Sequence, residues 1–599
     1  MTVTPSNLLT QWARLLIGGL AQAGVRDVVL SPGSRSTPFA WAALRHPGLR
    51  CHSILDERSA AFFAVGQGRI ADRPSLLVCT SGSAGAHYLP ALVEAAEAGV
   101  PVVALTADRP FELHDCSAPQ TVDQTRLFGG HARFVELGLP DARHEALSAL
   151  LRRAGQAVHA SAYPSPGPVH LNAPARKPLE PTGAATPEAS HLEQLVTHLL
   201  DRGATVPHPP RALPAPRGLA PILEACRSAR RGLIVCGPLP PGAPQLHAVT
   251  DLAEATGFPL LCEAASQLRL RPGSPAARFD AFDLLLQSDR FRAAAVPDVV
   301  LQLGAPPSSD GYDRYVSEHA GARRYVVAAR GWPDPQSSAT GLLLAEPGEA
   351  AAELARTLGA LPRHLIEERA AWSAALERAN AVAWEHVDAE LAAAAGLEEG
   401  SAIRALCGSL PAGGLLAVGN SLPIRELDTF VRAGTADVLV LSQRGANGID
   451  GLVSGAAGAA LASGRPTALL VGDLGFLHDL SGLWAARRVD RPLVLVVLDN
   501  DGGRIFEQLP LASLPEAARY MDAWLIPHGL DLTHAGRLFD IPTHRAEDEA
   551  TLRATLARAF DTRGCSLVVV GVPRQGAARL RKRLKERLDH ALAPLAASL

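Results

Sequence analysis

The sequence predicts an α/β protein with three doubly wound domains in series, each built on a parallel sheet with helices on both faces. The chain has 599 residues, enough for about three or four domains of ~150 residues. Hydrophobic residues make up 47% of the chain but aromatic residues only 5%, an aliphatic-rich composition typical of buried parallel sheets. Apolar runs of strand length also alternate with helical periodicity along most of the sequence.

The first domain is expected at residues 1–185. Helical periodicity runs from Leu8 to Ala23, and short apolar strands are predicted at 28–30, 76–79 and 102–105. Each of these strands is followed by a loop of small or polar residues. Because ligands bind at the carboxyl ends of the strands in such sheets, these loops are candidate binding segments.

Residues 186–216 are rich in Pro, Ala and His and are interpreted as a linker with one bridging helix near 191–201. A central domain at 217–360, a helical connection at 361–395 and a third domain at 396–599 complete the chain. Strands are predicted in the central domain at 232–236, 259–262, 299–303 and 324–328, and in the third domain at 415–418, 438–441, 468–471, 493–498 and 567–570. The first and third domains are compatible with one shared fold.

Charge and cysteine usage narrow the class of protein. The formal net charge is -3 with both signs interspersed, so nucleic acid is not expected as a partner. The eight cysteines show no Cys-x-x-Cys spacing, which favours buried thiols in a reducing compartment. No apolar run reaches membrane-spanning length, and the amino terminus lacks a basic and then apolar leader. We therefore expect a cytoplasmic protein without a membrane anchor.

The most informative stretch closes two successive strands with oxygen-bearing side chains. Gly472-Asp473-Leu474 follows one apolar run, and Asn500-Asp501-Gly502-Gly503 follows the next. At neighbouring carboxyl ends of a parallel sheet, these groups can bind a Mg²⁺ that holds a diphosphate. The alternative is that both segments are turns that merely end strands.

The spacing resembles the signature of the thiamine diphosphate-dependent enzymes, except that Leu474 stands where Gly is usual. The resemblance implies the thiamine-diphosphate-binding fold, with Mg²⁺, or Mn²⁺, held by Asp473, the side-chain oxygen of Asn500 and the carbonyl of Gly502. It also implies a carboxylate beside the pyrimidine ring of the cofactor, which activates it by sharing a proton. Glu57 at a strand-to-helix junction is the candidate catalytic residue. The alternative for Glu57 is an ordinary first-turn acid favoured by the helix dipole. The implied cofactor contacts are Pro32, Glu57, Ser81, Gly82, Ile449, Gly472, Asp473, Leu474, Asn500, Gly502 and Ile505.

A narrower resemblance rests on five segments, which are Leu30 to Pro38, Thr106 to Pro110, Gly419 to Arg425, Ser442 to Gly451 and Gly502 to Phe506. Together they resemble the 2-succinyl-5-enolpyruvyl-6-hydroxy-3-cyclohexene-1-carboxylate synthases of the menaquinone pathway. This family decarboxylates 2-oxoglutarate and adds the remaining unit to isochorismate. Both substrates carry carboxylates, which suit the bidentate fork of arginine. The implied substrate contacts are Ser34, Arg35, Arg109, Gln120, Ser421, Arg425, Arg444, Ile505 and Phe506.

The resemblance further implies that Ile449 lies under the thiazolium and that Ile505 and Phe506 form an apolar wall. It implies a homodimer or homotetramer, because Glu57 and Asp473 come from different subunits in the superfamily. The chain departs from the family at Pro119, where Asn is frequent, and at Ser308 to Gly311, where some relatives have a basic pair.

Two alternatives remain open from the sequence. One keeps the cofactor but acts on a smaller 2-oxoacid, as a decarboxylase or an acetolactate-synthase-like enzyme. The other is a non-catalytic α/β protein that binds a nucleotide.

Overall fold

The computed structural model describes residues 5–273 and 278–595. The chain forms two compact units, each assembled from several stretches of sequence. The first unit contains residues 1–210, 443–464 and 478–490, and the second contains 211–442, 465–477 and 491–599.

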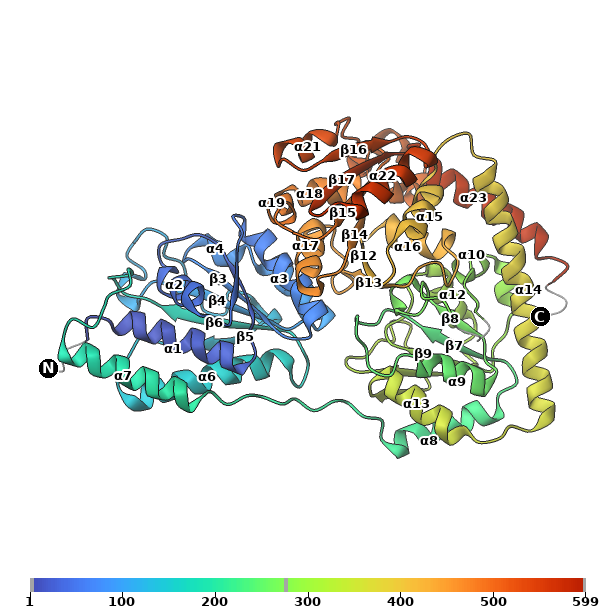
Figure 1. Ribbon diagram of the computed structural model, residues 1–599. Coiled ribbons are helices and arrows are strands. Elements are labelled where there is room, and N and C mark those ends of the chain that lie inside the picture. The colour runs from blue at the N-terminus through green and yellow to red at the C-terminus, as the bar shows by residue number, and fades with distance from the viewer. Residues whose placement is uncertain (1–4, 274–277, 596–599) are drawn as a thin grey trace. The chain divides into compact units, whose positions relative to one another are not determined.

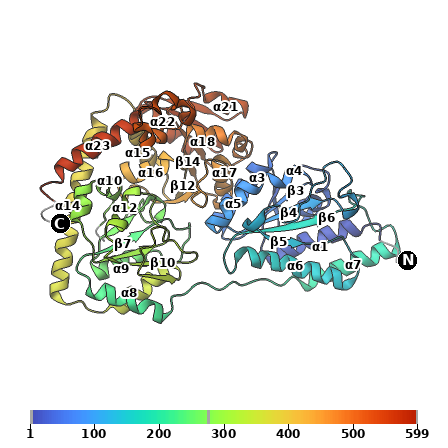
Figure 2. The same cartoon turned by 180° about the vertical axis from the view of Figure 1, so that it is seen from behind.

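Within its described residues, the first unit has a parallel sheet of six strands in the order β2-β1-β3-β4-β6-β5 (Figure 1). The strands are β1 (Asp27–Leu30), β2 (Arg50–Ser53), β3 (Ser75–Cys79), β4 (Val102–Asp108), β5 (Arg133–Glu136) and β6 (Pro168–Pro174). The helices α1 (Leu8–Ala23), α2 (Thr37–Arg45), α6 (His144–Ala162) and α7 (Pro187–Arg202) pack together on one face (Figures 1 and 2). The helices α3 (Glu57–Ala71), α4 (Ser83–Ala86) and α5 (Leu89–Ala98) also belong to this unit.

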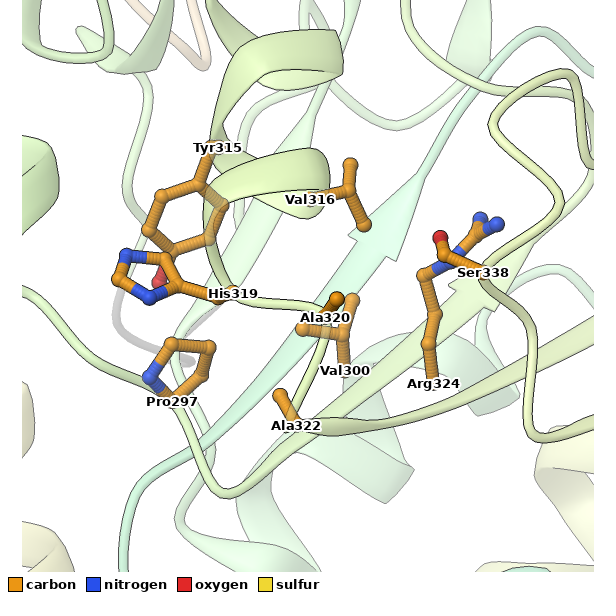
Figure 3. A pocket seen from close by; sticks show the side chains of 9 residues that line it. All are labelled: Pro297, Val300, Tyr315, Val316, His319, Ala320, Ala322, Arg324 and Ser338. Carbon is orange, nitrogen blue, oxygen red and sulfur yellow. The ribbon is translucent and has the colours of Figure 1, made fainter.

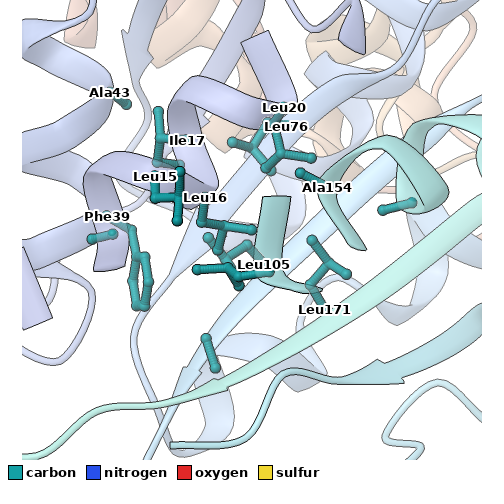
Figure 4. Packing of buried hydrophobic residues seen from close by; sticks show 14 of the residues in the cluster. Leu15, Leu16, Ile17, Leu20, Phe39, Ala43, Leu76, Leu105, Ala154 and Leu171 are labelled. Carbon is teal, nitrogen blue, oxygen red and sulfur yellow. The ribbon is translucent and has the colours of Figure 1, made fainter. Parts of the chain in front are cut away.

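The main core of the first unit lies between its sheet and this helical face. Leu15, Leu16 and Leu20 of α1 meet Leu76 and Leu105 of the strands (Figure 4). Leu192, Val196 and Leu199 of α7 are buried in the same core. The helix expected near 191–201 is therefore longer, and it packs on the first domain rather than lying within a linker.

Two helices from distant parts of the sequence complete the first unit. They are α17 (Leu452–Ser463) and α19 (Leu483–Ala486), and α17 crosses α3 at very short range. A Cβ on Gly458 would lie 2.0 Å from the carbonyl oxygen of Phe63, and one on Gly66 would lie 2.0 Å from that of Gly455. Glycine at these positions lets the two helix backbones touch.

The described part of the second unit contains two parallel sheets. The central sheet has the order β11-β10-β9-β7-β8, with β7 (Gly232–Cys236), β8 (Leu260–Cys262), β9 (Val299–Leu303), β10 (Arg323–Ala328) and β11 (Gly341–Leu344). Its helices are α8 (Pro216–Ser228), α9 (Ala248–Thr256), α10 (Phe282–Leu285), α11 (Asp289–Ala294), α12 (Asp310–Glu318), α13 (Pro347–Leu358) and α14 (Arg363–Ala392). The helices α13 and α14 are separated by a short break that includes Pro362. Arg369 of α14 is buried and donates to the carbonyl oxygens of Cys226, Ala229 and Thr256, which fixes the long helix to this layer.

The third sheet, also in the second unit, has the order β13-β12-β14-β15-β17-β16. Its strands are β12 (Gly414–Val418), β13 (Val438–Ser442), β14 (Thr467–Gly472), β15 (Leu493–Asp499), β16 (Thr543–Ala546) and β17 (Cys565–Gly571). Its helices are α15 (Glu399–Ser409), α16 (Leu422–Phe430), α18 (Asp473–His478), α20 (Asp522–Leu525), α21 (Thr533–Leu538), α22 (Glu549–Asp561) and α23 (Gly576–Ala591). Counted along the chain, the strand order is the same as in the first sheet. The expectation that these two blocks share one fold is therefore confirmed.

Candidate active site

Asp473 and the loop after β15 meet at the carboxyl edge of the third sheet. The strands β14 and β15 pair in parallel, with Gly472 opposite Leu498. The backbone N–H of Gly502 donates to Asp473 Oδ2 at 2.8 Å, and that of Leu474 donates to Oδ1 at 2.6 Å. Asp473 is buried, which raises its pKa, and the donated hydrogen bonds oppose that rise. The structure thus brings together the two halves of the predicted metal motif.

Asn500 presents one oxygen that no described residue satisfies. Its Nδ2 donates to Oε1 of Glu399 at 2.8 Å, while its buried Oδ1 lacks a hydrogen-bond partner. An unsatisfied buried carbonyl oxygen is costly unless a ligand completes it, and Mg²⁺ takes oxygen ligands of this kind. At Gly502, φ is +127° and a Cβ would lie 2.2 Å from the carbonyl oxygen of Leu525, so only glycine fits. The residues present therefore fit the implied cation.

His528 is a neighbour of this motif that sequence reasoning missed. Its Nε2 lies 3.3 Å from Asp473 Oδ2 and 3.7 Å from Asp499 Oδ1. These three side chains offer ligand atoms within 4.8 Å of one another. His528 comes 55 positions after Asp473 and has no fixed spacing to it that would have pointed to the contact.

Arg504 holds the backbone of the same loop. Its guanidinium donates to the carbonyl oxygens of Asn500 at 3.0 Å and Asp501 at 2.7 Å, and it pairs with Glu507 at 3.0 Å. The adjoining Ile505 and Phe506 are partly buried. Arg504 lies in the segment from Gly502 to Phe506 that the sequence analysis singled out, but only the structure shows that its side chain contacts the backbone of Asn500 and Asp501.

Ser421 and Arg425 lie beyond the carboxyl end of β12, which is the other neighbour of β14. Ser421 precedes α16 with φ +73°, and Arg425 Nη1 donates to its carbonyl oxygen at 2.7 Å. Behind them, Glu426 is fully buried. Its burial and the nearby carboxyl group of Glu399 raise the pKa of Glu426 well above its usual value.

In the first unit, the predicted loops after β1 and β3 interlock. A Cβ on Gly33 would lie 2.3 Å from the Cβ of Thr80, whose Oγ1 accepts from the backbone N–H of Arg35 at 3.3 Å. Pro32 and Ser34 flank Gly33 and are exposed. The carboxyl ends of these adjacent strands therefore form one continuous edge.

Ser81, Gly82 and Gln120 lie along this edge. Ser81 is buried, and its Oγ has no hydrogen-bond partner in the described part of the chain. Gly82 has φ +88° and donates its N–H to Gln124 Oε1 at 3.2 Å. A Cβ on Gly82 would lie 3.5 Å from the Cβ of Gln120, so the predicted substrate residue Gln120 lies beside the predicted cofactor residue Gly82.

Arg35 and Arg109 bring unsatisfied guanidinium groups to the first unit. Arg35 is 3% exposed and donates from Nη1 to the carbonyl oxygen of Ala175 at 2.5 Å. The buried Nε atoms of Arg35 and Arg109 find no acceptor among the described residues. Carboxylates are the acceptors that complete such groups.

Glu57 is the first residue of α3, at the predicted strand-to-helix junction. Asp56 caps the helix by accepting from the backbone N–H of Arg58 at 2.8 Å, so the carboxylate of Glu57 is not needed for capping. Glu57 is half-buried, and burial raises its pKa, partly offset by backbone hydrogen bonding and nearby His87. A carboxyl group with a raised pKa is suited to sharing a proton.

The segment that carries Arg444 and Ile449 belongs to the same unit as Glu57. Glu94 of α5, another residue that sequence reasoning missed, is buried and paired with Arg69. It accepts from the backbone N–H groups of Gly445 at 3.0 Å and Ala446 at 2.6 Å. Ile449 is 37% exposed, so its side chain is available to a ligand.

A small cavity in the central layer contains none of the predicted site residues. Tyr315, His319 and Arg324 are among its lining residues, and its volume is about 10 Å³ (Figure 3). This is the space of about one water molecule and is too small for a substrate.

The segment from Ser308 to Gly311 lies in the same layer. The backbone N–H of Ser308 donates to Oε2 of Glu263 at 2.7 Å.

Two family models match the chain. "Thiamine pyrophosphate enzyme, N-terminal TPP binding domain" matches residues 10–127, and "Thiamine pyrophosphate enzyme, C-terminal TPP binding domain" matches residues 440–570. A solved structure of a protein from Mycobacterium smegmatis, assigned to the thiamin diphosphate-dependent enzymes, has a TM-score of 0.65 and 20% identity. It covers 93% of this chain and 98% of its own, and at this identity it supports the fold alone.

Curated relatives match nearly the whole chain. A protein of Sorangium cellulosum is 47% identical, with 96% of this chain and 95% of the relative covered. Proteins of Geobacillus kaustophilus and Myxococcus xanthus are 40% and 38% identical, and at least 97% of each chain is covered. All three are named 2-succinyl-5-enolpyruvyl-6-hydroxy-3-cyclohexene-1-carboxylate synthase.

The fold and these matches define a thiamine diphosphate-dependent enzyme. Within that class, the chain belongs to the family of 2-succinyl-5-enolpyruvyl-6-hydroxy-3-cyclohexene-1-carboxylate synthases. In the described residues, no helix is both long enough and apolar enough to cross a membrane.

Proposed function

We propose that this chain decarboxylates 2-oxoglutarate with thiamine diphosphate and adds the remaining succinyl unit to isochorismate, releasing CO₂. The observation that carries the proposal beyond family membership is the pair of buried Nε donors on Arg35 and Arg109, which lack acceptors among the described residues. Two such groups suit substrates that carry several carboxylates better than they suit a small 2-oxoacid.

The metal site of the proposal is Asp473, Asn500 Oδ1 and the carbonyl of Gly502, holding Mg²⁺ or Mn²⁺ at the diphosphate end of the cofactor. The unsatisfied Oδ1 of Asn500 and the glycine-only geometry at Gly502 support this assignment. When bound, thiamine diphosphate supplies the carbon nucleophile and the electron sink that decarboxylation needs. Gly472 and Leu474 are proposed to flank the cofactor on either side of Asp473.

Glu57 is proposed as the catalytic residue that shares a proton with the pyrimidine ring. Its half-buried position and raised pKa support this role. Pro32, Ser81 and Gly82 are proposed to contact the cofactor, and Ile449 to support its ring system. Ile505 and Phe506 are proposed to exclude water from the reacting carbon.

Ser34, Arg35, Arg109, Gln120 and Arg444 in the first unit, with Ser421 and Arg425 in the second, are proposed to hold the substrates. We also propose a homodimer or homotetramer, which sedimentation velocity of the purified chain tests directly. A fully active monomer contradicts this assembly.

The function is tested by incubating the protein with Mg²⁺, thiamine diphosphate, 2-oxoglutarate and isochorismate and following loss of isochorismate. We expect loss that requires every component and that falls roughly 10²-fold or more in the Glu57→Gln variant. No loss, with pyruvate consumed instead, would assign the chain to the decarboxylase or acetolactate-synthase-like alternative.

A further inference from the structure

We propose that Glu399 is a positioning residue that orients the carboxamide of Asn500, so that Oδ1 rather than Nδ2 faces the divalent cation. The inference rests on the metal site of the proposed function. Glu399 lies on α15, 101 residues before Asn500, and belongs to none of the motifs that predicted the site.

The two ends of a carboxamide differ chemically but hardly in shape. Half a turn about the terminal torsion of Asn500 would exchange oxygen for nitrogen, and packing alone discriminates poorly between the two. Mg²⁺ requires the oxygen, because the amide nitrogen has no lone pair to offer. A neighbour that accepts but cannot donate resolves this ambiguity.

The carboxylate form of Glu399 is such a neighbour. Its Oε1 accepts from Asn500 Nδ2 at 2.8 Å, and in the flipped orientation Oδ1 would face a carboxylate oxygen. The two residues are 2% and 6% exposed, so water competes little with the contact. A lost or reversed hydrogen bond is therefore expensive here.

The backbone of Asn500 is fixed separately, by Arg504 Nε at 3.0 Å from its carbonyl oxygen. With the main chain held, the remaining freedom of Asn500 lies in its side chain. Glu399 takes the Nδ2 end, and the buried Oδ1 keeps its capacity for a ligand, since no described residue donates to it. This arrangement prepares the oxygen for a cation before the cation arrives.

The test measures the Mg²⁺ dissociation constant of the full-length protein by calorimetry, with thiamine diphosphate present. Glu399→Leu removes the acceptor, and we expect about tenfold or more weaker Mg²⁺ binding, as when an outer contact of a metal ligand is lost. Glu399→Gln can accept or donate, so a smaller loss is expected. Glu398→Gln, an acid-to-amide change on the adjacent residue, should bind Mg²⁺ like the parent.

A double-mutant cycle then asks whether Glu399 acts through Asn500. In an Asn500→Ala background, Glu399→Leu should cause no further loss of Mg²⁺ affinity. Equal losses in both backgrounds would overturn the proposal, and so would parental affinity in Glu399→Leu and Glu399→Gln despite a lower melting temperature. If Glu399→Leu does not fold, parental affinity in Glu399→Gln alone overturns it. A parent chain that binds no Mg²⁺ would refute the metal site itself, which is a separate result.

Discussion

At the residue scale, the candidate site is marked by polar atoms that the fold buries without satisfying. Arg109 Nε and Asn500 Oδ1 are two of them, one in each unit. Buried polar atoms without partners reduce the stability of a fold, so side chains that serve stability alone are paired or exposed to water. Their presence in loops at strand ends supports the ligand-binding roles proposed for these two side chains.

Arg109→Met should separate binding from stability. We expect the KM for the carboxylate substrates to rise at least tenfold, because a charge-assisted contact is lost. The melting temperature should hold or rise, because a buried donor without an acceptor is removed. Steady-state kinetics and thermal unfolding of the same preparation check both expectations, and a large loss of stability with unchanged KM contradicts them.

His170 should make the protein sensitive to acid. It is 1% exposed, packs against Phe128 and Phe134, and lies 2.8 Å from Thr106 Oγ1, and burial lowers its pKa to about 4. In the unfolded chain a histidine takes up its proton near pH 6.5, so the stability linked to neutral His170 is present above that pH. This contribution to the free energy of unfolding is lost as the pH falls toward 4, by up to about 3 kcal/mol.

Replacing this histidine by glutamine should therefore flatten the fall in unfolding free energy between pH 6.5 and 4, as measured by urea denaturation. His191→Gln, at an exposed position on α7, serves as the control and should keep the parental slope. Parallel curves for the parent and His170→Gln would show that His170 is not the responsible group.

The placement of Asp473, Asn500 and Glu57 was predictable because each directly follows a strand or starts a helix. Parallel pairing brings strand ends together whatever the intervening sequence. Glu399 and Glu94 were not predictable from the sequence. The side chain of Glu399 reaches Asn500 across 101 positions, and that of Glu94 reaches Gly445 across 351. No periodicity or fixed spacing encodes such contacts.

At the scale of elements, the helices α3 and α17 of the first unit cross at very short range. Gly458→Ala would place a methyl group about 2 Å from a backbone carbonyl of Phe63, so the helices must separate. We expect a loss of roughly 1–3 kcal/mol in unfolding free energy. Gly321→Ala, where a Cβ meets nothing within 4 Å, should be nearly neutral. Equal effects in denaturant titrations would contradict the crossing as the cause.

Most of the predicted strands are buried along all or nearly all of their length, such as β7 and β9. The strands β5, β11 and β16 were missed; they lie at sheet edges and are partly exposed, so their sequences carry polar residues. An edge strand gains one partner rather than two and needs a weaker apolar signal. The strand β6 is internal and was also missed, since His170 and Asn172 interrupt its apolar run.

At the scale of the whole molecule, neither unit is continuous in sequence. Domain prediction from sequence assumes continuous segments. It therefore could not predict that α17 belongs to the first unit. The domain boundaries proposed from the sequence, at 185, 216, 360 and 395, stay predictions.

A fragment of residues 1–210 should consequently fold poorly. It retains the sheet and the α1 core but lacks α17, whose contact with α3 would be replaced by water. We expect aggregation or a broad thermal transition by circular dichroism, compared with a cooperative transition of the full chain. A monomeric fragment that unfolds cooperatively at the parental temperature would show that α17 contributes little.

The repeated strand order of the first and third sheets has a consequence for where chemical groups are placed. One scaffold occurs twice in the chain, and in each copy the segments after the first four strands carry the candidate residues. In the first sheet the loops after the third and fourth strands carry Ser81 and Arg109, whereas in the third sheet the corresponding loops carry the proposed oxygen ligands Asp473 and Asn500. The same framework therefore supports two different sets of chemical groups, because the loops can differ while the strands that fix their positions keep one order.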